Sequence, residues 1–73
     1  MTLETFNTVK NHIIYHPTSV ELSDNTATYR GMFEGNKVTI RFEDVGYYCY
    51  LTMNEETYLS SKGVSGKPVL VEN

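Results

Sequence analysis

Two histidines, His12 and His16, are spaced so that they could hold a metal ion. Side chains four residues apart share one face of a helix, and imidazole pairs in this arrangement are common metal ligands. No glutamate follows His12 as in the zinc proteases, and Pro17 ends a helix directly after His16. We therefore expect two histidines near a helix end, with no bound metal and no cofactor.

The single cysteine, Cys49, could act as a nucleophile if a histidine lay beside it. It alternates with Tyr47 and Leu51, which places it on the apolar side of a strand. A buried thiol behaves as a small apolar group, has a raised pKa and is unreactive. We therefore expect Cys49 to be structural. One cysteine cannot form an internal disulfide, so a cytoplasmic, reducing location is expected.

Two acidic pairs, Glu43-Asp44 and Glu55-Glu56, could supply carboxylates for acid–base chemistry. Neighbouring residues on a loop rarely converge on one substrate atom, and we expect the two pairs at opposite ends of a sheet. They are therefore predicted either to solvate the loops or to form an acidic patch for a basic partner. Because no nucleophile–base pair or phosphate-binding loop is present either, the sequence predicts a protein without catalytic residues and without enzymatic activity.

The elements that must position these residues begin with one helix. Apolar residues at helical spacing from Leu3 to Ile13 form a single stripe, and Thr2 can cap the first turn. The pattern predicts a helix over residues 3–15. Several branched side chains lower its helix propensity, so an extended conformation over residues 12–16 stays open.

The remainder of the chain predicts antiparallel strands. Alternating polar and apolar residues indicate strands over 19–23, 26–33, 37–43 and 47–53, with a short last strand over 68–72. Between them, Glu55–Thr57 is expected to start a helical turn that points Tyr58 and Leu59 inward, and Ser60–Lys67 is expected to be a flexible loop. The sequence thus predicts one α+β domain over residues 1–73, with an N-terminal helix packed on an antiparallel meander of four to five strands.

Turn residues at 24–25, 35–36 and 43–46 predict the register of the meander. They place Val20 opposite Tyr29 and Leu22 opposite Ala27. They also place Phe33 opposite Val38, Ile40 opposite Cys49, and Arg41 opposite Tyr48. All three turns agree on one apolar face, which we expect the helix to cover: Val20, Leu22, Ala27, Tyr29, Gly31, Phe33, Val38, Ile40, Phe42, Tyr47, Cys49 and Leu51. Gly31 is expected to allow close approach of the helix.

The opposite face is the predicted protein-binding surface. Tyr, Arg and Met are enriched at interfaces, and this face carries Arg30, Met32, Arg41, Tyr48 and Tyr50. We expect Arg30 to lie opposite Arg41 and Tyr48 to stack on Arg41. A protein-binding or dimerisation face, a nucleic-acid platform and a plain solvated face all stay open. Because one helix cannot cover the whole sheet and neither edge is protected, we expect a homodimer that also binds a larger protein.

Length and composition limit the classes of protein that are compatible with this chain. It has 73 residues, 40% of them hydrophobic and 21% charged, which is typical of one small globular domain. The formal net charge of −3 argues against direct nucleic-acid binding. No apolar run is long enough to cross a bilayer, and Met1–Glu4 does not resemble the start of a signal peptide, so no membrane association is expected.

A very short, acidic, Tyr- and Asn-rich chain with one cysteine resembles the small host-takeover proteins of bacteriophages. The resemblance, in size and composition, implies a stoichiometric inhibitor of a host replication, transcription or defence protein in the host cytoplasm. Such an inhibitor can occupy a nucleic-acid site, for example a sliding-clamp channel, with the acidic pairs as mimics of DNA phosphates. The alternatives are a single-stranded nucleic-acid-binding module that uses the Arg and Tyr face, and a structural self-association domain.

Overall fold

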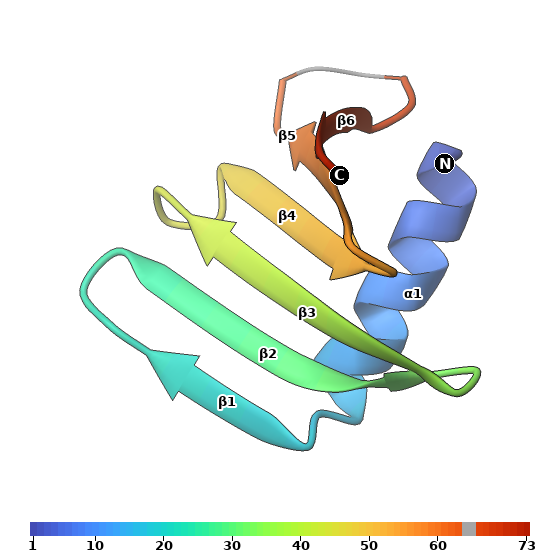
Figure 1. Cartoon of the computed structure of the whole chain (residues 1–73). Helices are drawn as coiled ribbons and strands as arrows, with labels where there is room; N and C mark the ends of the chain where they lie inside the picture. The colour runs from blue at the N-terminus through green and yellow to red at the C-terminus, as the bar shows by residue number, and fades with distance from the viewer. Residues whose placement is uncertain (64–65) are drawn as a thin grey trace.

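The computed structural model, described here for residues 1–63 and 66–73, contains one helix and one sheet (Figure 1). The elements in chain order are α1 (Leu3–Tyr15), β1 (Ser19–Leu22), β2 (Thr26–Phe33), β3 (Asn36–Glu43), β4 (Tyr48–Met53), β5 (Glu56–Ser61) and β6 (Val69–Glu72). The six strands form an antiparallel sheet in the order β1-β2-β3-β4-β5-β6. The predicted α+β class and the meander are confirmed, but the predicted number of strands was too low.

Helix α1 has the predicted bounds, since its start and end are set by local residues. The Thr2 side chain accepts a hydrogen bond from the backbone N–H of Thr5 (3.1 Å), and the N–H of His16 donates to the carbonyl of His12 (2.9 Å). The alternative of an extended segment over residues 12–16 is therefore wrong. In the described part of the chain, no helix has both the length and the apolar character needed to cross a membrane.

Strand β5 replaces the predicted helical turn. Asn54 and Glu55 adopt positive φ angles of 54° and 65°, which makes a two-residue turn that folds β5 back onto β4. Backbone pairing with β4 thus outweighs the local preference of these polar residues. Tyr58 packs against the core as predicted, whereas Leu59 lies opposite Tyr50 on the other face, so its predicted inward orientation was wrong.

The predicted loop over residues 60–67 is only partly a loop. Ser60 and Ser61 belong to β5, where they pair with Cys49 and Tyr48. Residues 64 and 65 of this predicted loop lie outside the described part of the chain. The predicted start of the loop at Ser60 was therefore wrong, because β5 continues to Ser61.

The predicted register is confirmed between β1 and β2. It is shifted by two residues between β2 and β3 and between β3 and β4. Val20 faces Tyr29 as predicted, but Phe33 faces Asn36, and Ile40 faces Leu51. The cause is the β2–β3 turn, which lies at residues 34–35 with positive φ at both, and the β3–β4 loop, which extends to residue 47. The predicted pairs Phe33–Val38, Ile40–Cys49 and Arg41–Tyr48 are therefore wrong.

A shift of two residues keeps every side chain on its predicted face. The core consists of apolar side chains from α1 and the covered face of the sheet: Phe6, Val9, Ile13, Val38, Ile40, Cys49 and Leu51. Gly31 allows the predicted close approach. A Cβ atom there would lie 3.2 Å from Ile13 Cδ1 and 3.3 Å from the carbonyl oxygen of His16.

Helix α1 covers only part of this face. It contacts β2 and β3, it shares the core with Cys49 and Leu51 of β4, and Figure 1 shows β1 at the margin of the sheet, beyond the helix. Val20 and Leu22 of β1 point to the helix side of the sheet yet are 47% and 71% exposed. The sheet therefore has a covered centre and an uncovered margin on one side, and its other side faces away from α1.

Candidate functional site

The face of the sheet that points away from α1 carries the predicted binding residues. We call it the uncovered face. Its side chains line up in rows across the paired strands. The central row runs through Thr28, Arg41, Tyr50, Leu59 and Val69. This row joins a cation, an aromatic ring and two aliphatic side chains on one surface.

Arg41 is held in place by two contacts. Its guanidinium carbon lies 4.6 Å from the centre of the Tyr50 ring, and its Nε lies 2.9 Å from Glu43 Oε2. The prediction that Tyr48 stacks on Arg41 was wrong, because the register shift puts Tyr50 opposite Arg41. A cation–π contact at an exposed site contributes about 0.5–1 kcal/mol. Together the two contacts fix the guanidinium over the sheet.

Arg30 is separated from Arg41 by the same register shift. It faces Thr39, and its guanidinium lies 3.3 Å from Glu21 Oε1. The predicted pairing of two arginines directly across the strands was therefore wrong, and Arg30 and Arg41 are diagonal neighbours on the same face. Each of these two arginines has a carboxylate partner on the same face.

Met32 and Tyr48 lie on the same face but away from the central row. Met32 is 44% exposed and faces Lys37, whereas Tyr48 is 36% exposed and its ring packs edge-on against Tyr47. The structure thus brings all five predicted binding residues onto one face. Among them, Arg41 and Tyr50 are in direct contact.

Sequence reasoning missed the contribution of β5 and β6 to this face. Leu59 is half-buried beside Tyr50, and Val69 is 59% exposed at the edge. Thr52 and Thr57 share a hydrogen bond of 2.9 Å between their hydroxyl groups in the neighbouring row. The sequence signal for β5 was weak: Thr57, Leu59 and Ser61 alternate with Glu56, Tyr58 and Ser60, as residues on the two faces of a strand do.

The four predicted acidic residues do not converge. Glu43 is paired with Arg41, and Asp44 lies in the exposed β3–β4 loop. Glu55 is in the β4–β5 turn at the opposite end of the sheet, and Glu56 accepts a hydrogen bond from the Tyr58 hydroxyl (3.1 Å). The predicted location at opposite ends is confirmed. Because Glu43 is already neutralised, these residues do not form a regular array of free negative charge.

The two histidines lie near each other at the end of α1. The His12 ring lies 5.2 Å from the His16 ring and 5.4 Å from the Phe33 ring, between centroids. Residues 1–63 and 66–73 contain no group of three or more His, Cys, Asp or Glu side chains that could hold a metal. Cys49 is buried as predicted, and burial raises the pKa of its thiol to about 11.

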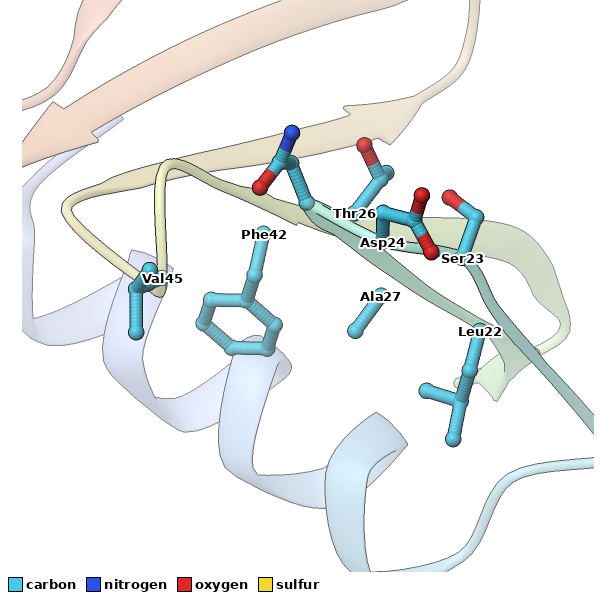
Figure 2. A pocket seen from close by; sticks show the side chains of 9 residues that line it. Leu22, Ser23, Asp24, Thr26, Ala27, Phe42 and Val45 are labelled. Atoms are coloured by element: carbon cyan, nitrogen blue, oxygen red, sulfur yellow. The ribbon is translucent and has the colours of Figure 1, made fainter.

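A second surface lies on the helix side, at the β1–β2 hairpin. A hollow of about 360 Å³ is lined by Leu22, Ala27 and Phe42, and Val45 beside it is 90% exposed. Figure 2 shows these four side chains pointing toward the α1 side of the sheet, while Asp24 and Thr26 point away. Four polar residues of the hairpin also line this hollow: Ser23, Asp24, Asn25 and Thr26.

Comparisons with protein-family models, with curated proteins and with solved structures give no match for this chain. The uncovered face is the surface on which most of the predicted residues meet.

Proposed function

We propose that this chain is a non-enzymatic protein-binding module that docks a protein partner on its uncovered face. The observation that carries the proposal is the central row, where Arg41 is fixed between Tyr50 and Glu43 and continues into Leu59 and Val69. Arginine and tyrosine dominate the binding energy at protein interfaces. A side chain that is already ordered loses less entropy when the partner binds.

A protein partner fits this face better than a nucleic acid. A phosphate backbone needs cations that are free to neutralise it, but Arg30 and Arg41 each have a carboxylate within 3.3 Å and 2.9 Å. Glu21 and Glu43 would lie against the phosphates. The net charge of −3 adds long-range repulsion. The single-stranded nucleic-acid module is therefore the weaker candidate.

The finer proposal concerns the class of partner. We propose a bacterial replication, transcription or defence protein, met in the host cytoplasm and inhibited in a stoichiometric complex, as the resemblance to phage host-takeover proteins implies. The acidic pairs would then contact basic groups at the margin of the partner. The ion pair between Glu43 and Arg41 favours mixed-charge contacts over phosphate mimicry.

A second copy of the chain is also part of the proposal. The strand order leaves one side of β1 and of β6 unpaired within the described sheet. Val20, Leu22 and Leu70 on these strands are 44–71% exposed. Unpaired edges with exposed apolar side chains are usually used in association.

The test compares two tyrosines on opposite sides of the molecule. Tyr50→Ala removes the ring under Arg41, whereas Tyr15→Ala removes an exposed ring on α1 and is the matched control. The immobilised chain is used to capture proteins from a bacterial lysate, and light scattering gives its mass over a range of concentrations. We expect Tyr50→Ala to lower capture about tenfold and Tyr15→Ala to leave it unchanged, a difference of about 1.4 kcal/mol.

Circular dichroism establishes that both variants are folded. A folded Tyr50→Ala variant that keeps both its captured protein and its mass would contradict binding through the uncovered face. Binding of single-stranded DNA that falls steeply with salt would instead favour the nucleic-acid candidate.

A further inference from the structure

A separate hollow of about 340 Å³ lies on the helix side of the sheet, between the first turns of α1 and the paired ends of β4 and β5. Its apolar lining comes from Leu3, Phe6 and Phe42, and Cys49 also faces it. The volume falls within the range of small-molecule sites. None of these residues lies on the uncovered face, so the hollow is independent of the function proposed above.

The charge around this hollow is of one sign. Lys10 and Lys62 both line it, and no carboxylate is among its lining residues in the described part of the chain. Neither lysine forms an ion pair with any described residue. The whole chain is acidic, with nine acidic and six basic residues. The lining of this hollow is instead positively charged. The ammonium groups leave the hollow suited to an anion.

Both lysines are attached to ordered backbone. Lys10 is half-buried in the middle of α1, one turn after Phe6. The backbone N–H of Lys62 donates to the carbonyl of Tyr47 (2.9 Å), which ties the end of β5 to the β3–β4 loop. The two lysines are therefore supplied by different elements, Lys10 by α1 and Lys62 by the turn after β5.

The charge of Lys10 also acts on the floor of the hollow. Burial has the larger effect on the Cys49 thiol and raises its pKa, whereas the Lys10 ammonium lowers this pKa. The resulting pKa of the thiol is about 11. The Lys10 ammonium is thus close enough to favour negative charge at Cys49. The polar part of the lining also includes Asn7, Tyr47 and Ser60.

We propose that this hollow binds a small amphipathic anion, whose carboxylate, sulfonate or phosphate group lies between Lys10 and Lys62. The apolar body of the ligand packs against Phe6 and Phe42. Each ammonium group donates charge-assisted hydrogen bonds to the anion, so loss of one lysine weakens binding about tenfold.

The test uses anilinonaphthalene sulfonate, a fluorescent anion with an apolar body, and phenylnaphthylamine, which has the same rings without the sulfonate. Each is titrated into the full chain and into Lys10→Met, Lys62→Met and Lys37→Met. Lys37→Met is the matched control, because Lys37 faces Met32 on the uncovered face. We expect the sulfonate to bind about tenfold more weakly to the first two variants, and equally to the control. Phenylnaphthylamine should not distinguish the four proteins.

Labelling of Cys49 with iodoacetamide, a neutral reagent, locates the bound probe. The thiol faces this hollow and not the apolar corner at the β1–β2 hairpin. We expect saturating sulfonate to slow labelling of the folded protein several-fold in the wild type and in Lys37→Met. Equal sulfonate affinity in all four proteins, or an unchanged labelling rate with the probe bound, would overturn the proposal.

Discussion

Leu51 and Leu22 have the same side chain and lie on the same face of the sheet, but Leu51 is 0% exposed and Leu22 is 71% exposed. Leu51 belongs to β4 in the centre, under α1, whereas Leu22 belongs to the edge strand β1. A helix is about 10 Å wide with its side chains, and strands are about 4.8 Å apart, so one helix cannot cover all six strands. The alternation of residues decides which way a side chain points, and the helix decides whether it is buried.

The comparison therefore separates two kinds of apolar residue in this small chain. Those under α1 stabilise the fold, while those beyond it contribute little until another surface covers them. The uncovered face has no helix over any of its described rows. Its side chains are consequently available for binding.

The largest expected effect comes from replacing the two leucines. Leu51→Ala should lower the free energy of unfolding by about 3 kcal/mol, because it leaves a cavity in the core. Leu22→Ala should lower it by less than about 0.5 kcal/mol, because that side chain is already in solvent. Urea denaturation of the two variants measures the difference. Similar losses would show that β1 is covered in solution.

The pH dependence of stability tests the covered side through Cys49. Burial raises the pKa of this thiol from 9.0 to about 11, so the unfolded chain loses the proton first as the pH rises. The stabilisation is complete below pH 9.0 and is lost by about pH 11. The free energy of unfolding should fall by about 2 kcal/mol more in the wild type than in Cys49→Ala over this range. Parallel curves would mean that the thiol is in solvent.

The contact between the helix and β2 is tested at Gly31. A methyl group there would lie 3.2 Å from Ile13 Cδ1, so Gly31→Ala should cost about 1–2 kcal/mol of unfolding free energy. Ile13→Val removes that methyl group and should reduce the cost of Gly31→Ala in the double variant. Strict additivity in this double-mutant cycle would contradict the close approach.

The smallest effect is expected at the start of the covering helix. Thr2→Ala removes the acceptor of the Thr5 N–H and should cost about 1 kcal/mol of unfolding free energy. Thr8→Ala, at an exposed position inside α1, is the control and should cause no loss. Thermal unfolding followed by circular dichroism compares them. A larger loss at Thr8 than at Thr2 would argue against the cap.

The features that were predicted correctly depend on local residues or on the period of two. The bounds of α1 follow from Thr2 and from Pro17, and the two faces survive because a shift of two residues leaves the alternation intact. The five predicted binding residues lie on the expected face for this reason. Their face could be predicted from the sequence, but their neighbours could not.

The neighbours depend on turns that the residue types do not specify. Glu34, Val45 and Glu55 adopt positive φ angles without being glycine, and together with the residues beside them they set where each strand begins. Strand β5 was missed because its core-facing positions, Glu56, Tyr58 and Ser60, include only one apolar side chain. Consequently the Arg41–Tyr50 contact and the role of Leu59 required the structure.

The most direct test of binding through the uncovered face is a methyl NMR comparison of the two faces. Spectra are recorded for the chain alone at several concentrations and after addition of the captured partner. Met32, Leu59 and Val69 report on the uncovered face, whereas Leu22 and Leu51 report on the helix side. We predict shifts or broadening at the first three, with Leu51 unchanged. Changes confined to Leu22 and Leu51 would contradict the proposal.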